Sequence, residues 1–398
     1  KEETESKKKS AENNYEKILE NEKLLIGAIK GLEREIGDKE VTIENIRAIE
    51  STEQEVMIGK SISENFLVAG DTLENFDLIK DEITGQLDAA KKHYKNQIDY
   101  AYNPDFDSRK IVGDNYADQR EQYYGNNDVE GPDAFHGTHV AGIVGAVRNN
   151  DLGMNGIADN VQIMSVRTVP DGDERDKDVA NAIRYAVDNG ASIINMSFGK
   201  GYSWDKSVVD DAVRYARKND VLLVHAAGNS SQDNDNTDNF PNNTYGKKKL
   251  FGKKAADNWL EIGALNYAQG ESLSAPFSNY GKSEVDVFAP GMAIYSTTPD
   301  NEYQNAQGTS MAAPVVAGVA TVLRSYFPRL SARQVKDIIM NSAVKQNIKV
   351  KKPGSDEMVN FSDLSVTGGV VSLEEAVKLA MKTKGKKRIK RKKKNDKA

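Results

Sequence analysis

Cysteine is absent from the 398 residues of this chain, and histidine occurs only four times. The lack of cysteine excludes disulfide bonds, thiolate metal ligands and a cysteine nucleophile. No apolar run approaches the roughly 20 residues that cross a bilayer, so no transmembrane segment is predicted. The sequence also shows no signal-peptide pattern, and it starts with Lys1 rather than Met.

Charge is unevenly distributed along the chain, although the net charge is only −6. Residues 1–100 contain 15 basic and 23 acidic side chains, whereas residues 382–398 contain 11 basic side chains and one acid. An acidic body with a short basic tail does not give a uniformly basic surface, so no nucleic-acid partner is expected. A tail that binds an anionic polymer is the alternative.

Proline is missing from residues 1–103, where Glu and Lys alternate with Leu and Ile. This pattern is typical of charged amphipathic helices and predicts a helical insert or appendage. A partner-binding coiled coil is the alternative. Proline and glycine become regular after Asn103, so residues 104–381 are predicted to form the main domain. Residues 382–398 are predicted to be a disordered basic tail.

Short apolar runs alternate with helical patterns in the main domain. Strands are expected at Val161–Val166, Ser192–Met196, Val221–Ala226 and Val285–Phe288, and helices at Thr138–Val147, Lys177–Asn189, Asp205–Lys218, Met311–Tyr326 and Ala332–Ser342. This alternation predicts an α/β fold in which a parallel sheet is flanked by helices on both faces.

Two histidines lie in the segment His136-Gly137-Thr138-His139, which follows a polar loop and begins a predicted helix. Open α/β sheets bind ligands at such positions, so His136 could be a general base. A structural hydrogen bond is the alternative. A zinc pair is disfavoured, because zinc-binding histidines on a helix are usually four residues apart with a carboxylate nearby.

Three further motifs lie at predicted strand ends or helix starts. Ser310, in Gly308–Pro314, begins a helix whose dipole favours developing negative charge, although an ordinary N-cap serine also fits. Asn229 follows the strand Val221–Ala226 and could donate its amide to an oxyanion, or form a simple Gly-Asn turn. Asn195–Gly199 ends another strand and offers main-chain hydrogen bonds to an extended peptide.

The segments H-G-T-H-V-A-G, N-M-S-F-G, A-A-G-N and G-T-S-M-A-A-P, in this order, resemble the subtilisin-like serine proteases. The resemblance implies a subtilisin-like fold and a serine endopeptidase that acts on proteins or peptides through an acyl-enzyme, without a cofactor for the chemistry. It implies that His136 is the base, Ser310 the nucleophile and Asn229 the oxyanion donor. A non-catalytic relative that binds peptides or partners is the alternative. The resemblance further implies that the substrate is flanked by Ser197, Phe198, Gly199, Ala226, Ala227 and Gly228.

The family also has an aspartate that orients the histidine, and its V-x-D-[ST]-G-type motif is missing before His136. Asp114, at the end of the strand-like run Ile111–Asn115, is the nearest candidate. We expect instead that the aspartate lies upstream of Lys1, that residues 1–103 are an insert, and that this chain alone is weakly active or inactive. A removable propeptide is the alternative interpretation of residues 1–103.

The loop Asn149–Met154 resembles the family's calcium loop, and Asp233–Asp238 is a second acidic loop. Structural calcium is therefore a further expectation, with plain turns as the alternative. The family is mostly secreted or attached to the cell envelope, which implies the same location here. The sequence leaves the oligomeric state, the cleavage specificity and the metal ligands open.

Overall fold

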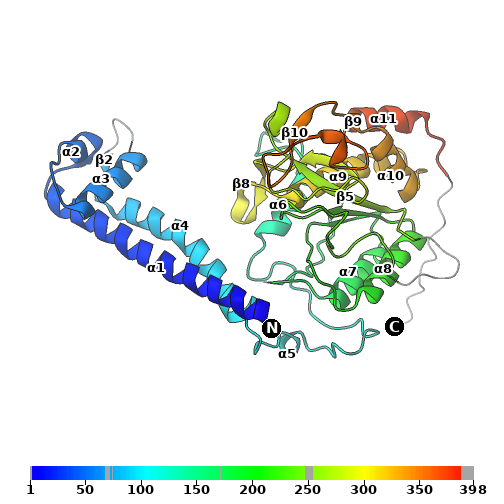
Figure 1. Ribbon diagram of the computed structural model, residues 1–398, viewed down its shortest axis with the longest axis horizontal. Helices are drawn as coiled ribbons and strands as arrows, with labels where there is room; N and C mark the ends of the chain where they lie inside the picture. The colour runs from blue at the N-terminus through cyan, green and yellow to red at the C-terminus, as the bar shows by residue number, and fades with distance from the viewer. Residues whose placement is uncertain (1, 68–71, 74, 171, 247–253, 387–398) are drawn as a thin grey trace. The chain divides into compact units, whose positions relative to one another are not determined.

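The computed structural model describes residues 2–67, 72–73, 75–170, 172–246 and 254–386 (Figure 1). The chain divides into two units, Lys1–Ile111 and Val112–Ala398. The boundaries after residues 103 and 381 remain predictions of domain organisation. Residues 387–398, most of the predicted basic tail, lie outside the described residues.

Helices make up most of the first unit. They are α1 (Glu2–Ile36), α2 (Ile43–Arg47), α3 (Gln54–Phe66) and α4 (Asp77–Asn96), which continues as the π-helical turn η1 (Gln97–Ala101). A short antiparallel pair joins β1 (Val41–Thr42) to β2 (Thr72–Leu73). The helical character predicted for this region is confirmed.

Helices α1 and α4 run antiparallel. Glu22 of α1 pairs with Lys91 of α4 at 2.8 Å, and Glu33 pairs with Lys80 at 2.9 Å, so positions rise along one helix as they fall along the other. The apolar core of the unit includes Ile29, Leu32, Ile36, Val56, Phe76, Ile79 and Ile83. The first unit therefore has a hydrophobic core of its own.

A six-stranded sheet organises the second unit, with the strand order β3-β4-β5-β6-β12-β9. Its strands are β3 (Ile193–Met196), β4 (Leu222–Ala226), β5 (Trp259–Leu265), β6 (Val287–Pro290), β12 (Gly369–Val370) and β9 (Val344–Lys345). The pairs from β3 to β12 are parallel, and β9 is antiparallel to β12. Strand β3 lies at an edge, where its only strand partner among the described residues is β4.

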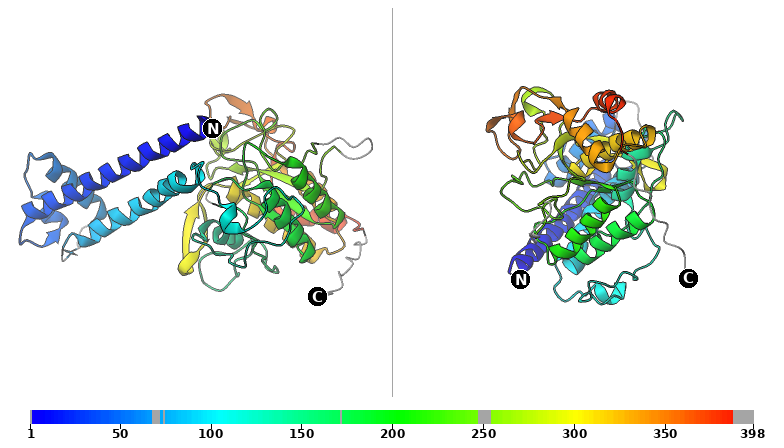
Figure 2. Two further views of the ribbon diagram at one scale, coloured as in Figure 1. Left: turned by 90° about the horizontal axis from the view of Figure 1, so that it is seen from below. Right: turned by 90° about the vertical axis from the view of Figure 1, so that its right-hand side faces the viewer.

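Alternate residues of the central strands point to opposite faces of the sheet. Leu222 and Val224 of β4 pack in a core with α9 (Thr309–Tyr326) and α10 (Ala332–Asn341), whereas Val221 and Leu223 pack with α7 (Asp176–Asp188) and α8 (Lys206–Lys218). Helices therefore cover both faces of a mostly parallel sheet (Figure 2), which confirms the predicted fold class.

The remaining elements are short and lie outside the sheet. They are α5 (Arg109–Val112), α6 (Phe135–Gly145), α11 (Leu373–Lys382), the hairpin of β7 (Ile294–Thr298) and β8 (Glu302–Ala306), the pair β10 (Lys349–Lys351) and β11 (Met358–Asn360), and the 3-10 turns η2 (Gly270–Ser272), η3 (Pro299–Asn301) and η4 (Phe361–Asp363). None of the helices in the described part of the chain is long and apolar enough to span a bilayer.

Two of the predicted strands are wrong. Val161–Val166 has no regular structure, and Ile163 and Met164 are 50% and 40% exposed. A β-branched run becomes a strand only where a neighbour completes its hydrogen bonds, and no strand of the described chain pairs with it. Ile111–Asn115 is not a strand either, because Arg109–Val112 forms α5.

Candidate active site

Ser310 lies in the first turn of α9, beside the end of β3. Its hydroxyl donates a hydrogen bond to the carbonyl of Ser197 at 3.2 Å, and the hydroxyl of Ser197 donates to the carbonyl of Ser310 at 2.8 Å. The side chain of Asn195 donates in turn to the Ser197 hydroxyl at 2.9 Å. These bonds fix the segment that follows the edge strand β3 against the start of α9.

Asn229 follows β4 and is held by Thr309, the first residue of α9. Its Oδ1 accepts hydrogen bonds from the main-chain N–H of Thr309 at 2.8 Å and from the Thr309 hydroxyl at 2.9 Å. The same hydroxyl accepts a bond from the N–H of Gly228 at 3.1 Å. Because both bonds to Asn229 use its oxygen, the Nδ2 group is left to donate to another partner.

Two N–H donors converge beside Gly308. A methyl group placed on its Cα would lie 3.3 Å from Nδ2 of Asn229 and 3.5 Å from the main-chain nitrogen of Ser310. Gly308 has φ 149° and ψ 163°, a conformation that is essentially restricted to glycine. The absent side chain thus keeps open a space lined by two donors at the positive end of a helix, which is the geometry that stabilises an oxyanion.

His136 lies in the first turn of α6, as predicted. The residue keeps solvent-accessible surface. The surrounding protein nevertheless lowers the pKa of its ring below the ordinary histidine value, first by desolvation and then through the charge of His139, while Asp133 opposes the shift. His136 is nevertheless an exposed residue, and the lowered pKa favours the neutral ring, which is the form that acts as a general base. Within the described residues, no hydrogen bond joins it to Ser310 or to a carboxylate.

The second histidine of the motif is structural. His139 is fully buried, its Nε2 lies 3.0 Å from the carbonyl oxygen of Gln304 in β8, and its ring stacks on Phe135. No group of three or more His, Asp or Glu side chains in the described chain is arranged to hold a metal ion. A zinc pair of His136 and His139 thus gains no support.

Asp114 is committed to a buried ion pair. Its carboxylate lies 2.7 Å from Nζ of Lys177, and the two side chains are 0% and 1% exposed. Lys177 also contacts Glu121 at 2.8 Å and donates to the carbonyl of Asn115 at 2.8 Å. A buried lysine needs such compensation, because an unpaired charge in the interior is strongly destabilising. Asp114 is therefore a poor candidate for the aspartate that orients His136.

The predicted substrate-flanking residues lie at the ends of β3 and β4. Phe198 is half-buried, and its ring meets that of His225 edge-on with the centroids 6.3 Å apart. Ala226 and Ala227 are buried, and the carbonyl of Ala227 accepts hydrogen bonds from the side chains of Asn234 and Asn239. The sequence does not identify His225 as part of this region; its one signal is a polar residue inside an apolar strand.

The loop Asn149–Met154 uses its side-chain oxygens internally. Oδ1 of Asn150 accepts a bond from the N–H of Leu152 at 3.3 Å, and Oδ1 of Asn155 accepts one from the N–H of Asn149 at 2.8 Å. No acidic cluster forms there among the residues that the structure describes. Calcium at this loop remains a prediction.

A serine beside two converging donors at the end of a parallel sheet is the arrangement of a serine hydrolase that transfers acyl groups. Comparison with known proteins narrows this class. Residues 77–363 match the family described as Subtilase family, and the chain belongs to it. The subtilases are serine endopeptidases, so the resemblance seen in the four motifs is confirmed.

Several relatives are similar over more than half of the chain. A thermophilic serine proteinase of Bacillus sp. strain AK1 is 38% identical over 230 residues, which are 57% of this chain and 50% of that protein. Subtilisin DY of Bacillus licheniformis is 36% identical over 238 residues, 59% of this chain and 77% of the relative. The chain thus spans about half the length of the first of these relatives.

Solved structures agree with the sequence comparison. The structure titled "Proteases from Pseudoalteromonas arctica PAMC 21717" has a TM-score of 0.50 and 30% sequence identity, covering 62% of this chain and 70% of the other. A mutant of the protease domain of PatA has a TM-score of 0.50 and 26% identity, covering 65% of this chain and 84% of the other.

Proposed function

We propose that the protein to which this chain belongs cleaves peptide bonds as a serine endopeptidase, through an acyl-enzyme intermediate. The observation that carries the proposal is the convergence of Asn229 Nδ2 and the Ser310 N–H on one point beside Gly308. A non-catalytic peptide-binding protein would not need two nitrogen donors this close together beside the nucleophile.

The reaction begins when the Ser310 hydroxyl attacks a peptide carbonyl while neutral His136 takes its proton. The carbonyl oxygen becomes an oxyanion that accepts hydrogen bonds from Asn229 and from the Ser310 N–H. His136 then protonates the leaving amine, and a water molecule, activated by the same ring, hydrolyses the acyl-enzyme. For Ser310 to take part, its hydroxyl must exchange its bond to Ser197 for one to His136.

The substrate is proposed to lie between Ser197–Gly199 and Ala226–Gly228, which follow or end the adjacent strands β3 and β4. The protein is proposed to act outside the cell or at the envelope. One relative supports this location: a protein of Bacillus subtilis strain 168 named cell wall-associated protease is 32% identical over 243 residues, 61% of this chain and 25% of the relative.

The partner that orients His136 is proposed to be an aspartate that lies outside Lys1–Ala398 and arrives on a strand beside β3. Three observations support this. In the described chain, no strand pairs with the outer edge of β3, and none pairs with the run Val161–Val166. The carboxylate of Asp114 is held in an ion pair with Lys177. Loss of the equivalent aspartate costs about 3 × 10⁴ in turnover in subtilisin. The isolated chain is therefore expected to be weakly active.

Labelling with a fluorophosphonate tests the proposal, because this probe modifies only an activated serine. The purified chain and its Ser310→Ala variant are treated with the probe and compared by intact mass. One addition that depends on Ser310 supports a serine hydrolase. If a chain extended by an aspartate-bearing strand is also not labelled, the non-catalytic alternative replaces the proposal.

A further inference from the structure

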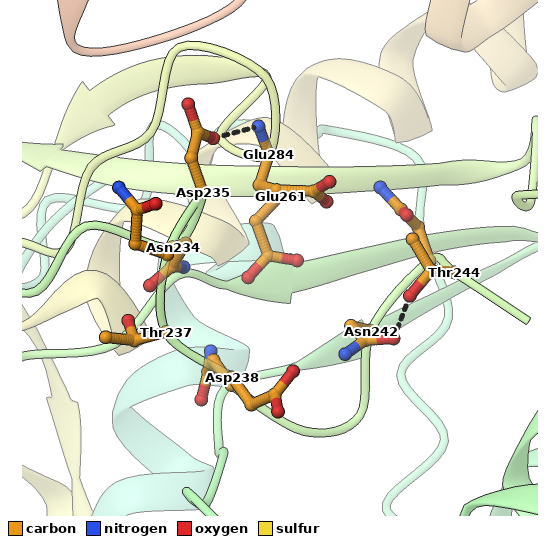
Figure 3. Close-up of a pocket in the computed structure, with 11 residues that line it drawn as sticks. Asn234, Asp235, Thr237, Asp238, Asn242, Thr244, Glu261 and Glu284 are labelled. Atoms are coloured by element: carbon orange, nitrogen blue, oxygen red, sulfur yellow. Dashed lines mark hydrogen bonds between the residues drawn. The ribbon is translucent and has the colours of Figure 1, made fainter. Parts of the chain in front are cut away.

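A cavity of about 250 Å³ lies in the second unit and is lined in part by Asn239. Its walls come from the loop 234–244, from Glu261 of β5 and from Glu284, which precedes β6. Figure 3 shows the side chains of these separate segments around one space. Small-molecule sites occupy roughly 300–1,000 Å³, so this cavity suits a single side chain better than a whole ligand.

Asn239 connects this cavity to the substrate segments. Its side chain is part of the cavity wall, and its Nδ2 donates to the carbonyl of Ala227 at 2.9 Å and towards that of Ala226 at 3.4 Å. A side-chain carbon at Gly199 would lie 2.6 Å from Oδ1 of Asn239. Asn239 therefore bridges the two segments and turns its amide oxygen, an acceptor, toward the space between them.

The cavity is lined by acidic side chains. Four of its lining residues are acidic, namely Asp235, Asp238, Glu261 and Glu284, and none is basic. Asp235 is satisfied, because it accepts bonds from the main-chain N–H groups of Ser283 and Glu284 at 3.0 and 2.9 Å. The other three carboxylates come from different segments and face the same space (Figure 3).

Glu261 is the most deeply placed of these acids, with 5% of the residue exposed. It lies next to His225 in the register of β5 and β4, and its oxygens are 2.9 and 3.0 Å from Nδ1 of that ring. Trp259 donates to it at 2.8 Å. Burial raises the pKa of both Glu261 and Glu284, with Asp235 adding to the shift of Glu284. A positive charge in the cavity would relieve this unfavourable burial of carboxylates.

A bound metal ion is the less suitable occupant. Within the described residues, no three His, Asp or Glu side chains are grouped to hold a metal, so a metal in this cavity would depend on amide and carbonyl oxygens. A protonated amine or guanidinium needs only hydrogen-bond acceptors spread around it, which the amide of Asn239 and the carboxylates of Asp238 and Glu261 provide.

We infer that this cavity selects a lysine or arginine as the substrate residue that precedes the scissile bond. The inference rests on the proposed function, and it makes Asn239, Asp238 and Glu261 the residues that determine specificity. The cationic side chain passes between Ser197–Gly199 and Ala226–Gly228, donates to Oδ1 of Asn239 and places its charge near the two carboxylates.

Binding to the Ser310→Ala chain tests the inference without requiring turnover. Peptide amides of one sequence that end in arginine, citrulline, lysine or norleucine are compared by fluorescence anisotropy. The arginine peptide should bind at least tenfold more tightly than the neutral citrulline peptide, and the lysine peptide at least tenfold more tightly than the norleucine peptide. A tenfold difference corresponds to about 1.4 kcal/mol. Both preferences should weaken as salt is raised.

Matched variants localise the effect. Asp238→Asn and Glu261→Gln should each reduce the arginine preference severalfold, whereas Asp356→Asn, an exposed acid on the same unit, should leave it unchanged. Asp238 is exposed, so its variant keeps the test valid even if Glu261→Gln unfolds the chain.

Equal binding of arginine and citrulline would overturn the inference, and the labelling of Ser310 would still support the proposed function. Conversely, if the chain prefers the arginine peptide but is never labelled at Ser310, the inferred binding pocket stands and the proposed peptidase activity is rejected. The cavity would instead be a metal site if two results occurred together. Calcium would raise the melting temperature of the parent chain but not of the Asp238 and Glu261 variants, and all four peptides would bind equally.

Discussion

Replacing Gly308 with alanine tests the site most directly, because it adds one methyl group where two donors converge. The backbone conformation at Gly308 is one that other residues reach only at a cost of about 1–3 kcal/mol, so the free energy of unfolding should fall by that amount. The methyl carbon would also lie 3.3 Å from Asn229 Nδ2, in the space proposed for the oxyanion. Loss of one such donor in subtilisin lowers turnover about 10²–10³-fold, and the variant should lose at least as much.

Two measurements separate the effects. Urea denaturation gives the change in stability, and the rate of fluorophosphonate labelling at a urea-free condition gives the change at the site. Gly201→Ala is the matched control, because its backbone needs no positive φ and nothing lies within 4 Å of the added carbon. A folded Gly308→Ala chain that is labelled within twofold of the parent rate would refute the convergence of donors at this point.

Three further predictions concern single residues. The acid limb of the labelling rate should have its midpoint below about pH 6.5, because the pKa of His136 is lowered from its ordinary value; a midpoint above pH 7 would contradict this. Asp114→Asn should destabilise the fold by less than the roughly 3–5 kcal/mol of a fully unpaired buried charge, since Glu121 still pairs with Lys177. The folded fraction should be labelled at the parent rate, and a specific loss of labelling would instead make Asp114 catalytic. Asn229→Asp should keep the hydrogen bonds from Thr309 but lose the side-chain N–H that donates to the oxyanion. The labelling rate should therefore fall without a comparable fall in melting temperature. An unchanged labelling rate would show that Asn229 is not the oxyanion donor.

The sequence predicts the position of a strand well where the strand has a neighbour. Val221–Ala226 and Val161–Val166 are similarly rich in β-branched residues, yet only the first has partners on both sides and forms β4. Strand β5 is not predicted, because Glu261 and Gly263 interrupt its apolar run. The structure explains the glutamate, which pairs with His225 of the adjacent strand.

The residues of the candidate site can be proposed from the sequence, but the hydrogen bonds and ion pairs between them cannot. Local motifs locate Ser310, Asn229 and His136, because each lies at a strand end or a helix start. The amide of Asn239 could not be anticipated, since its contacts with Ala227 and Gly199 depend on how a distant loop folds back. Long-range ion pairs such as that of Asp114 are hidden for the same reason.

The hydroxyl of Thr309 has a consequence for how activity is lost on heating. It joins the N–H of Gly228 to the amide of Asn229, and it belongs to the first residue of a helix whose small side chains are buried against the sheet. The donors of the site are thus attached to the central layer of the fold and not to a mobile surface loop. Inactivation by heat should therefore coincide with the cooperative melting of the second unit, and residual labelling can serve as a measure of the folded population.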